Sequence, residues 1–252
     1  MTRLTFRRIA FGAIIAPLTL GLAACGEKVD STASLSGEPI ERIAPPQGKI
    51  WTEVVSKTDA GGYRMGNPDA PIKLVEYGSL TCPHCANFAE TSGEELHEEF
   101  VKSGRVSFEF RNFVTNPLDL TMAMLTRCGT PESFFALTEQ TFANQPAIVE
   151  TWSSASEAQL NQTAALPPES RFQAIADLAG LPEFFAARGI AADQAKACLA
   201  DNATAEALAK ATSDQGNEFG ITGTPSFLIN GQKVDMNSWP EIKTELETLG
   251  AR

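Results

Sequence analysis

Two cysteines separated by two residues, placed where a predicted strand meets a predicted helix, constrain this chain more than any other feature. Residues 72–77 read as a strand, residues 83–102 read as a helix, and Cys82 and Cys85 bracket the first helical turn. One turn brings the two sulfurs within reach of a disulfide, and the unpaired N–H groups of that turn favour an anion at Cys82. The pattern predicts a redox-active pair in which Cys82 is a thiolate.

The residues between the cysteines, Pro83 and His84, favour a chain that oxidises its partners. His84 can supply a further donor or a positive charge when its ring faces the Cys82 sulfur. A stabilised thiolate stabilises the reduced form and is a good leaving group, so the disulfide is readily donated. We expect a substrate thiolate to attack Cys82 and form a mixed disulfide. Cys85, the less exposed of the two, then closes the internal disulfide when the chain is recharged.

The same cysteine spacing also occurs in metal sites, and a metallochaperone that holds Cu(I) or Zn(II) on the two thiolates is an alternative. The sequence contains no second C-x-x-C, and its other histidine, His97, lies well along the predicted helix. The strand-to-helix placement favours redox chemistry. We therefore expect neither a metal nor a cofactor at this site.

Residues 1–24 have the pattern of a secretory signal peptide. Three arginines precede an apolar run at 9–22, which is shorter than the roughly 20 residues that a membrane-spanning helix needs. The run ends in Leu22-Ala23-Ala24-Cys25, which matches the lipobox of bacterial lipoproteins and predicts an acylated Cys25. Ordinary cleavage that leaves Cys25 free is the alternative. We expect a periplasmic protein anchored to a membrane by lipid.

The charge of the chain argues against a nucleic-acid partner. The formal net charge is −11, and it becomes −14 once residues 1–24 are removed with their three arginines. Phosphate binding draws on clustered Lys and Arg, which a chain this acidic lacks.

The rest of the chain divides by composition and periodicity. Residues 25–49 are polar and rich in Ser and Pro, as in a flexible tether. A short strand is expected at Ile50–Val55 and a loop at 59–71. Residues 106–111 alternate as a half-buried strand, which completes a strand-helix-strand unit with parallel strands.

Helical spacing without a convincing strand continues through 117–216, which predicts a helical insert. Its clearest helical stretches lie at 120–127, 133–142, 171–179 and 204–212. A strand returns at 226–229, and Asn230-Gly231 predicts a tight hairpin before 232–234. Ser238 is expected to cap the last helix, with Glu241 closing a capping box.

Several motifs together resemble those of DsbA-like thioredoxin-fold proteins. They are Asn67–Pro71, Val75–Tyr77, Cys82–Cys85, Gly220–Pro225 and Phe227–Gly231. The resemblance extends from about residue 60 to the C-terminus. It implies an α/β chain with a thioredoxin fold, whose first part at 50–116 and second part at 217–252 are separated by the helical insert.

The resemblance also implies roles for residues outside the cysteine motif. Pro225 is expected to be cis and to face the cysteines, leaving the Thr224 backbone free to pair with an extended substrate. Glu76 matches an acidic residue of the family. Burial would raise its pKa and suit proton transfer with Cys85, whereas exposure at a strand end is the alternative.

The implied substrates are reduced or unfolded exported proteins, and the implied recharging partner is a DsbB-like quinone-linked membrane oxidase. Thr224 and the pair Leu80-Thr81 depart from the oxidase type, so an isomerase or reductase of the same fold is an alternative. Isomerases of this kind carry an N-terminal dimerisation domain, for which residues 26–60 are too short. We therefore expect a monomer.

Two further cysteines, Cys128 and Cys198, both fall in the helical insert. Disulfides persist in exported proteins, and we predict that these two cysteines form a structural one. Two free buried cysteines are the alternative.

Overall fold

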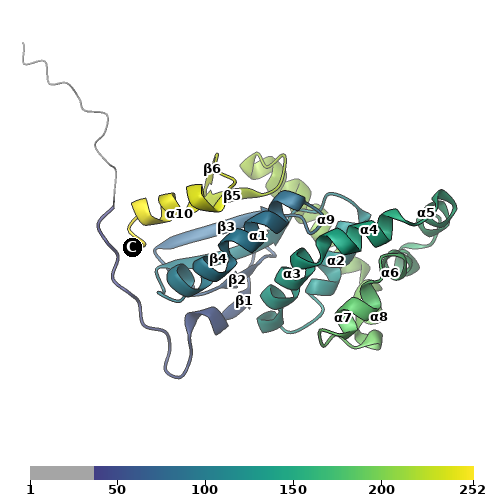
Figure 1. Cartoon of the computed structure of the whole chain (residues 1–252), viewed down its shortest axis with the longest axis horizontal. Helices are drawn as coiled ribbons and strands as arrows, with labels where there is room; N and C mark the ends of the chain where they lie inside the picture. The colour runs from purple at the N-terminus through teal and green to yellow at the C-terminus, as the bar shows by residue number, and fades with distance from the viewer. Residues whose placement is uncertain (1–36) are drawn as a thin grey trace, which may run out of the picture. The chain divides into compact units, whose positions relative to one another are not determined.

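A mixed sheet of six strands organises residues 37–252, which are the residues described by the computed structural model (Figure 1). The strand order is β1-β2-β4-β3-β5-β6. The strands are β1 Val55–Lys57, β2 Tyr63–Met65, β3 Ile72–Gly78, β4 Val106–Asn112, β5 Ser226–Ile229 and β6 Gln232–Val234. Only β3 and β4 pair in parallel, and the other neighbours are antiparallel.

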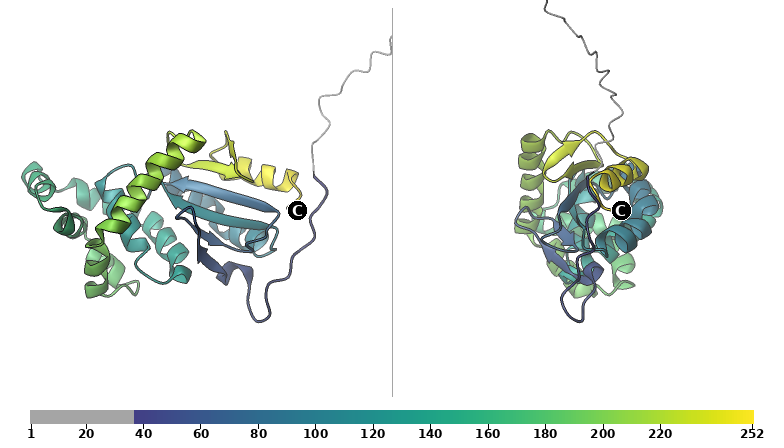
Figure 2. Two further views of the ribbon diagram at one scale, coloured as in Figure 1. Left: turned by 180° about the vertical axis from the view of Figure 1, so that it is seen from behind. Right: turned by 90° about the vertical axis from the view of Figure 1, so that its left-hand side faces the viewer.

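Strand β3 is buried on both of its faces, because helices cover the two sides of the sheet. Ile72 and Leu74 point into the larger hydrophobic core, whereas Val75 and Tyr77 join a smaller cluster on the opposite face. Helices α1, Pro83–Glu95, and α10, Trp239–Thr248, lie on the first face, and α9, Asn202–Phe219, lies on the other (Figure 2). Alternation along β3 therefore places Glu76 on the same face as Ile72 and Leu74, beneath α1.

The helical insert lies at the end of the sheet where β3 finishes (Figure 1). Its helices are α2 Pro117–Thr126, α3 Phe134–Ala143, α4 Gln145–Ser153, α5 Glu157–Ala164, α6 Pro168–Leu178, α7 Leu181–Ala186, α8 Ala192–Leu199 and α9. No strand interrupts residues 117–216, all of which the structure describes. The four clearest predicted stretches correspond to α2, α3, α6 and α9, and the shorter helices between them were not predicted.

The predicted strand at Ile50–Val55 is wrong. Trp51–Glu53 form a 3₁₀ turn, and β1 begins only at Val55. Trp51 is buried, and its indole N–H donates to the Ile43 carbonyl at 2.7 Å. These contacts stabilise the turn in place of a strand. The loop predicted at 59–71 contains a strand, β2, because Tyr63 pairs with Phe110 at the edge of β4.

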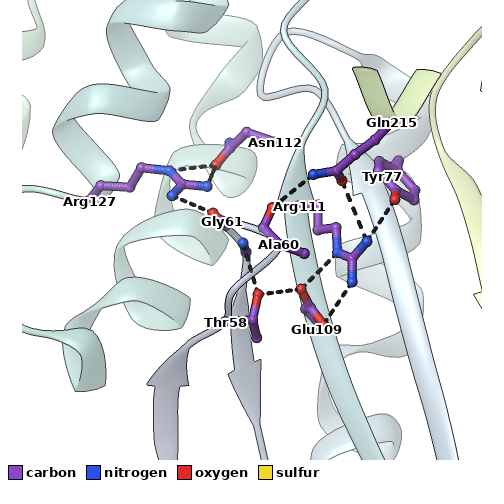
Figure 3. Close-up of polar contacts among 10 residues, drawn as sticks. Thr58, Ala60, Gly61, Tyr77, Glu109, Arg111, Asn112, Arg127 and Gln215 are labelled. Carbon is purple, nitrogen blue, oxygen red and sulfur yellow. Dashed lines mark hydrogen bonds and ion pairs between the residues drawn. The ribbon is translucent and has the colours of Figure 1, made fainter. Parts of the chain in front are cut away.

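Polar contacts link strands β3 and β4 to each other and to the insert (Figure 3). Arg111 of β4 donates to Glu109 through Nε at 2.7 Å and through Nη2 at 3.2 Å. It also donates to the Tyr77 hydroxyl at 2.8 Å. From the insert, Arg127 donates to Asn112 Oδ1 through two nitrogens, at 3.0 and 2.7 Å. These contacts satisfy polar groups that would otherwise be buried without partners.

The C-terminal elements follow the predicted local rules. Asn230 and Gly231 have φ values of 50° and 80°, the left-handed conformations that a two-residue hairpin of this kind needs. Ser238 and Glu241 form the expected capping box of α10. Helix α1 continues into a π-helical turn at Leu96–Val101. None of the helices in residues 37–252 combines the length and apolarity needed to cross a membrane.

Candidate active site

Cys82 occupies the N-cap of α1, at the end of a four-residue connection that leaves β3. We call this connection, Ser79–Cys82, the active-site turn. Cys82 has extended backbone angles, φ −84° and ψ 119°, and Pro83 opens the helix behind it. Proline suits this position because its missing N–H has no partner in the first turn of any helix. The first N–H groups of α1 are therefore left free to interact with the Cys82 sulfur.

The pKa of Cys82 is lowered to about 5. Its hydrogen bond with the Cys85 side chain contributes most, partial burial opposes the shift, and Thr224 and the N–H groups of Cys85 and His84 lower the pKa further. His84 acts here through its backbone, and its side chain lies in solvent. These donors favour the anion, as is usual for a cysteine at a helix N-terminus.

Cys85 is more deeply buried than Cys82, and its surroundings oppose ionisation of its thiol. Its side chain is completely buried, and the two cysteines are reduced, with no disulfide between them. Burial raises the pKa of Cys85 strongly, and the hydrogen bond that its thiol donates to Cys82 and the negative charge of Glu76 raise it further. Cys82 is therefore the sulfur that ionises and reacts, whereas Cys85 keeps its proton.

Glu76 lies beneath α1, between Phe110 of β4 and Phe227 of β5. Only 2% of its surface is exposed, and burial, followed by the charge on Cys82, raises its pKa to about 8. Its Oε1 atom and the Thr138 hydroxyl have no hydrogen-bond partner among the described residues. Both residues line a small cavity of about 30 Å³. A carboxyl group in this setting can hold a proton near neutral pH.

The loop before β5 faces Cys82 from the opposite side. The Thr224–Pro225 peptide bond is cis, and the Cys82 sulfur lies 3.2 Å from the Thr224 carbonyl oxygen. Both residues of this peptide are half-buried. The loop thus brings a backbone carbonyl into contact with the reactive sulfur.

The structure brings together most of the residues that the sequence singled out. Cys82, Pro83, His84 and Cys85 open α1, Glu76 lies beneath it, and Thr224 and Pro225 lie opposite. Cys128 and Cys198 form a disulfide within the insert. Cys25, the lipidation candidate, lies outside the described residues.

Two residues that contact the active-site turn were missed by the sequence analysis. Asp119 of α2 and Gln145 of α4 form hydrogen bonds to its backbone. In sequence, Asp119 looks like an ordinary acidic residue of a first helical turn, and Gln145 looks like a surface amide. Their burial was the missing observation, since both are at most 4% exposed.

Metal ligands do not gather elsewhere in the part of the chain that the structure describes. Within residues 37–252, no group of three or more His, Cys, Asp and Glu side chains is arranged to hold a metal ion.

Comparison with known proteins supports the assignment of fold and chemistry. Residues 58–248 match the family model described as Thioredoxin. A crystal structure of protein-disulfide isomerase from Novosphingobium aromaticivorans is 34% identical, covers 73% of this chain and 96% of its own, and superposes with a TM-score of 0.69.

Two further relatives agree with this match. A Rickettsia bellii protein with the provisional name protein-disulfide oxidoreductase is 26% identical over 202 residues, which cover 80% of this chain and 69% of that protein. The crystal structure of Wolbachia pipientis alpha-DsbA1 shares the fold at 24% identity, with a TM-score of 0.56, and covers 75% of this chain and 90% of its own.

Proposed function

Since this chain belongs to the thioredoxin family and is a DsbA-like thiol:disulfide oxidoreductase, we propose that it donates its Cys82–Cys85 disulfide to reduced proteins. The observation that carries the proposal is the opposite behaviour of the two thiols. The pKa of Cys82 is lowered to about 5, and burial raises that of Cys85. An easily ionised Cys82 stabilises the reduced form, which makes the disulfide form an oxidant.

In the first step, a substrate thiolate attacks the Cys82 sulfur of the oxidised chain. The Cys82–Cys85 bond breaks, a mixed disulfide forms at Cys82, and the bonding electron pair goes to Cys85. A buried thiolate at Cys85 is unfavourable, so it needs a proton. Glu76, with a pKa of about 8, is buried beneath α1 and can supply one at neutral pH.

In the second step, another thiolate of the substrate attacks the substrate sulfur of the mixed disulfide. The substrate gains a disulfide, and Cys82 leaves as a thiolate that the first turn of α1 stabilises. The two electrons lost by the substrate now reside in the dithiol. A DsbB-like quinone-linked membrane oxidase is the proposed acceptor of these electrons.

The surroundings of Cys82 suit an extended substrate segment. The Thr224 carbonyl can accept an N–H from the substrate backbone, in the manner of strand addition. A groove of about 720 Å³ begins at Pro83 and Gln145 and continues along α1 and α3. The proposed substrates are therefore reduced or unfolded exported proteins.

The proposal places this chemistry in the periplasm, with the chain a monomer that is exported by residues 1–24 and held at a membrane by lipid on Cys25. Residues 25–49 would serve as the tether. The signal-peptide and lipobox patterns of the sequence support this location.

A second candidate function is disulfide isomerisation. It is favoured by the name of the relative from Novosphingobium aromaticivorans and by Thr224 before the proline. An isomerase would use the same Cys82 thiolate, but as the attacking group on a wrongly paired substrate.

One pair of measurements separates these functions. The equilibrium of the dithiol with glutathione buffers should give a reduction potential above about −200 mV, and the oxidised chain should oxidise a reduced model protein. The Cys82→Ser variant is the control and should do neither. Poor oxidation of the reduced protein together with good activity of the reduced chain on scrambled disulfides would favour the isomerase, and a potential near the thioredoxin value of about −270 mV would contradict the oxidase proposal.

A further inference from the structure

Two residues of the helical insert hold both backbone polar groups of Leu80, in the middle of the active-site turn. Asp119 Oδ1 accepts the Leu80 N–H at 2.8 Å, and Gln145 Nε2 donates to the Leu80 carbonyl at 2.8 Å. Leu80 and Asp119 are fully buried, and Gln145 is 4% exposed. In a buried setting these backbone groups need partners, and here both partners come from the insert.

Gln145 extends this contact to the nucleophile. The same Nε2 atom donates to the Cys82 carbonyl at 3.0 Å, so one amide group uses its two hydrogens on two carbonyls of the turn. The Cys82 carbonyl also accepts the Ala86 N–H at 3.2 Å, which is an early hydrogen bond of α1. Gln145 therefore contacts the peptide from which the helix begins.

The backbone direction at Cys82 matters because donors of the first turn act on its sulfur. The N–H groups of His84 and Cys85 favour the thiolate only while Cys82 keeps its extended N-cap conformation. A turn that is free to rotate would separate the sulfur from these donors.

We propose that Asp119 and Gln145 are positioning residues for Cys82, which hold the active-site turn so that the first N–H groups of α1 point at the sulfur. Both residues bond to backbone groups of the turn, so they act on Cys82 through the geometry of the turn. The inference rests on the proposed function, since it concerns the reactivity of the same thiolate. It gives the helical insert a direct part in that reactivity.

Gln145 is the sharper probe of the two residues. Asp119 also accepts from the Thr115 N–H at 2.9 Å and from the Thr115 hydroxyl at 3.1 Å, so its removal would disturb a second loop. Within the described residues, the hydrogen bonds of the Gln145 side chain both go to the active-site turn.

The test is Gln145→Met in the full chain, which keeps the length of the side chain and removes its donors. We expect the pKa of Cys82 to rise by about one unit, a tenfold change in its ionisation constant, as followed by thiolate absorbance. A tenfold loss of reduced-form stability lowers the reduction potential by about 30 mV in the glutathione equilibrium. Gln140→Met, at an exposed position of α3, is the matched control and should change neither quantity.

Gln145→Asn is a second variant, because it keeps a buried amide but is one methylene too short to reach both carbonyls. It should shift both quantities in the same direction, and it decides the question if the Met variant does not fold. A lower free energy of unfolding with an unchanged Cys82 pKa and potential would overturn the proposal, because the role would then be structural only. Failure of the unchanged chain to oxidise a reduced protein would contradict the proposed function instead, and the Cys82 titration would still decide on Gln145.

Discussion

The sulfur of Cys82 lies 3.2 Å from the backbone carbonyl oxygen of Thr224, although 142 residues separate the two in sequence. A thiol can donate a hydrogen bond to that oxygen, but a thiolate or a disulfide sulfur cannot. The carbonyl is therefore satisfied by Cys82 in the reduced, protonated form and becomes available when the sulfur ionises or forms a disulfide. The proposed substrate meets the disulfide form, in which the Thr224 carbonyl is free to accept a hydrogen bond from it.

The ionisation of Cys82 gives the first prediction. In the reduced chain, the rate of alkylation should rise with pH around a midpoint of about 5 and become constant above it. Among the cysteines of residues 37–252, only Cys82 should react at neutral pH, because Cys85 is buried with a raised pKa and Cys128 and Cys198 are joined in a disulfide. Peptide mapping after brief alkylation checks the site, and Cys82→Ser should show no label in this part of the chain. A midpoint near the usual value of about 8.5 would contradict the proposed mechanism.

Glu76 should make the stability of the reduced chain depend on pH. Its pKa is raised from 4.5 to about 8, so keeping it buried costs little below pH 4.5, and the cost grows as the pH rises to 8. Glu76→Gln removes this cost and should raise the free energy of unfolding by about 3 kcal/mol at pH 7, with almost no effect at pH 4. Denaturant unfolding over this range measures the difference.

The control for this prediction is Glu90→Gln, at an exposed position of α1, which should show no such growth with pH. Equal stability of Glu76→Gln and the unchanged chain at pH 8 would show that the carboxyl is solvated in solution.

Removal of the Cys128–Cys198 disulfide should lower the stability of the chain and leave the redox chemistry of Cys82 intact. Cys128 and Cys198 are 70 residues apart in sequence, and a loop of this length corresponds to about 4 kcal/mol in the chain-entropy relation. The double variant Cys128→Ala and Cys198→Ala should lose up to that amount of unfolding free energy and keep the Cys82 ionisation. Mass spectrometry of the unreduced chain should find the two cysteines in one linked peptide, and alkylation of Cys128 would contradict the bridge.

The ion pair between Glu109 and Arg111, both on β4, gives a prediction about the stability of the sheet. The two side chains are 12% and 15% exposed, so removal of one partner leaves the other charge largely buried. Glu109→Gln should lower the free energy of unfolding by about 3 kcal/mol, and adding Arg111→Met should recover much of the loss.

The exposed pair between Glu98 and Lys102 serves as the control for this experiment, because Glu98→Gln should cost less than about 1 kcal/mol. Equal effects at the two pairs would show that the Glu109 site is hydrated.

Local patterns predicted the elements that depend on local physics. The alternation of β4, the hairpin at Asn230-Gly231 and the capping box of Ser238 all follow from the residues that form them. The error at Ile50–Val55 has the opposite cause. Its apolar spacing looks like a strand, but Trp51 is buried through a contact with Ile43 that no local pattern contains.

The same division applies to the site. The sequence alone was enough to place an ionisable Cys82 and a second cysteine on the first turn of a helix, because the spacing and the strand before it are local features. It left the environment of Glu76 undecided between burial and exposure. Only the tertiary structure decided that β4, β5 and α1 bury this carboxyl, that Thr224 meets the sulfur, and that Asp119 and Gln145 hold the active-site turn. The physical reason is that desolvation and hydrogen bonding at Cys82 depend on segments distant in the chain, and packing brings them together.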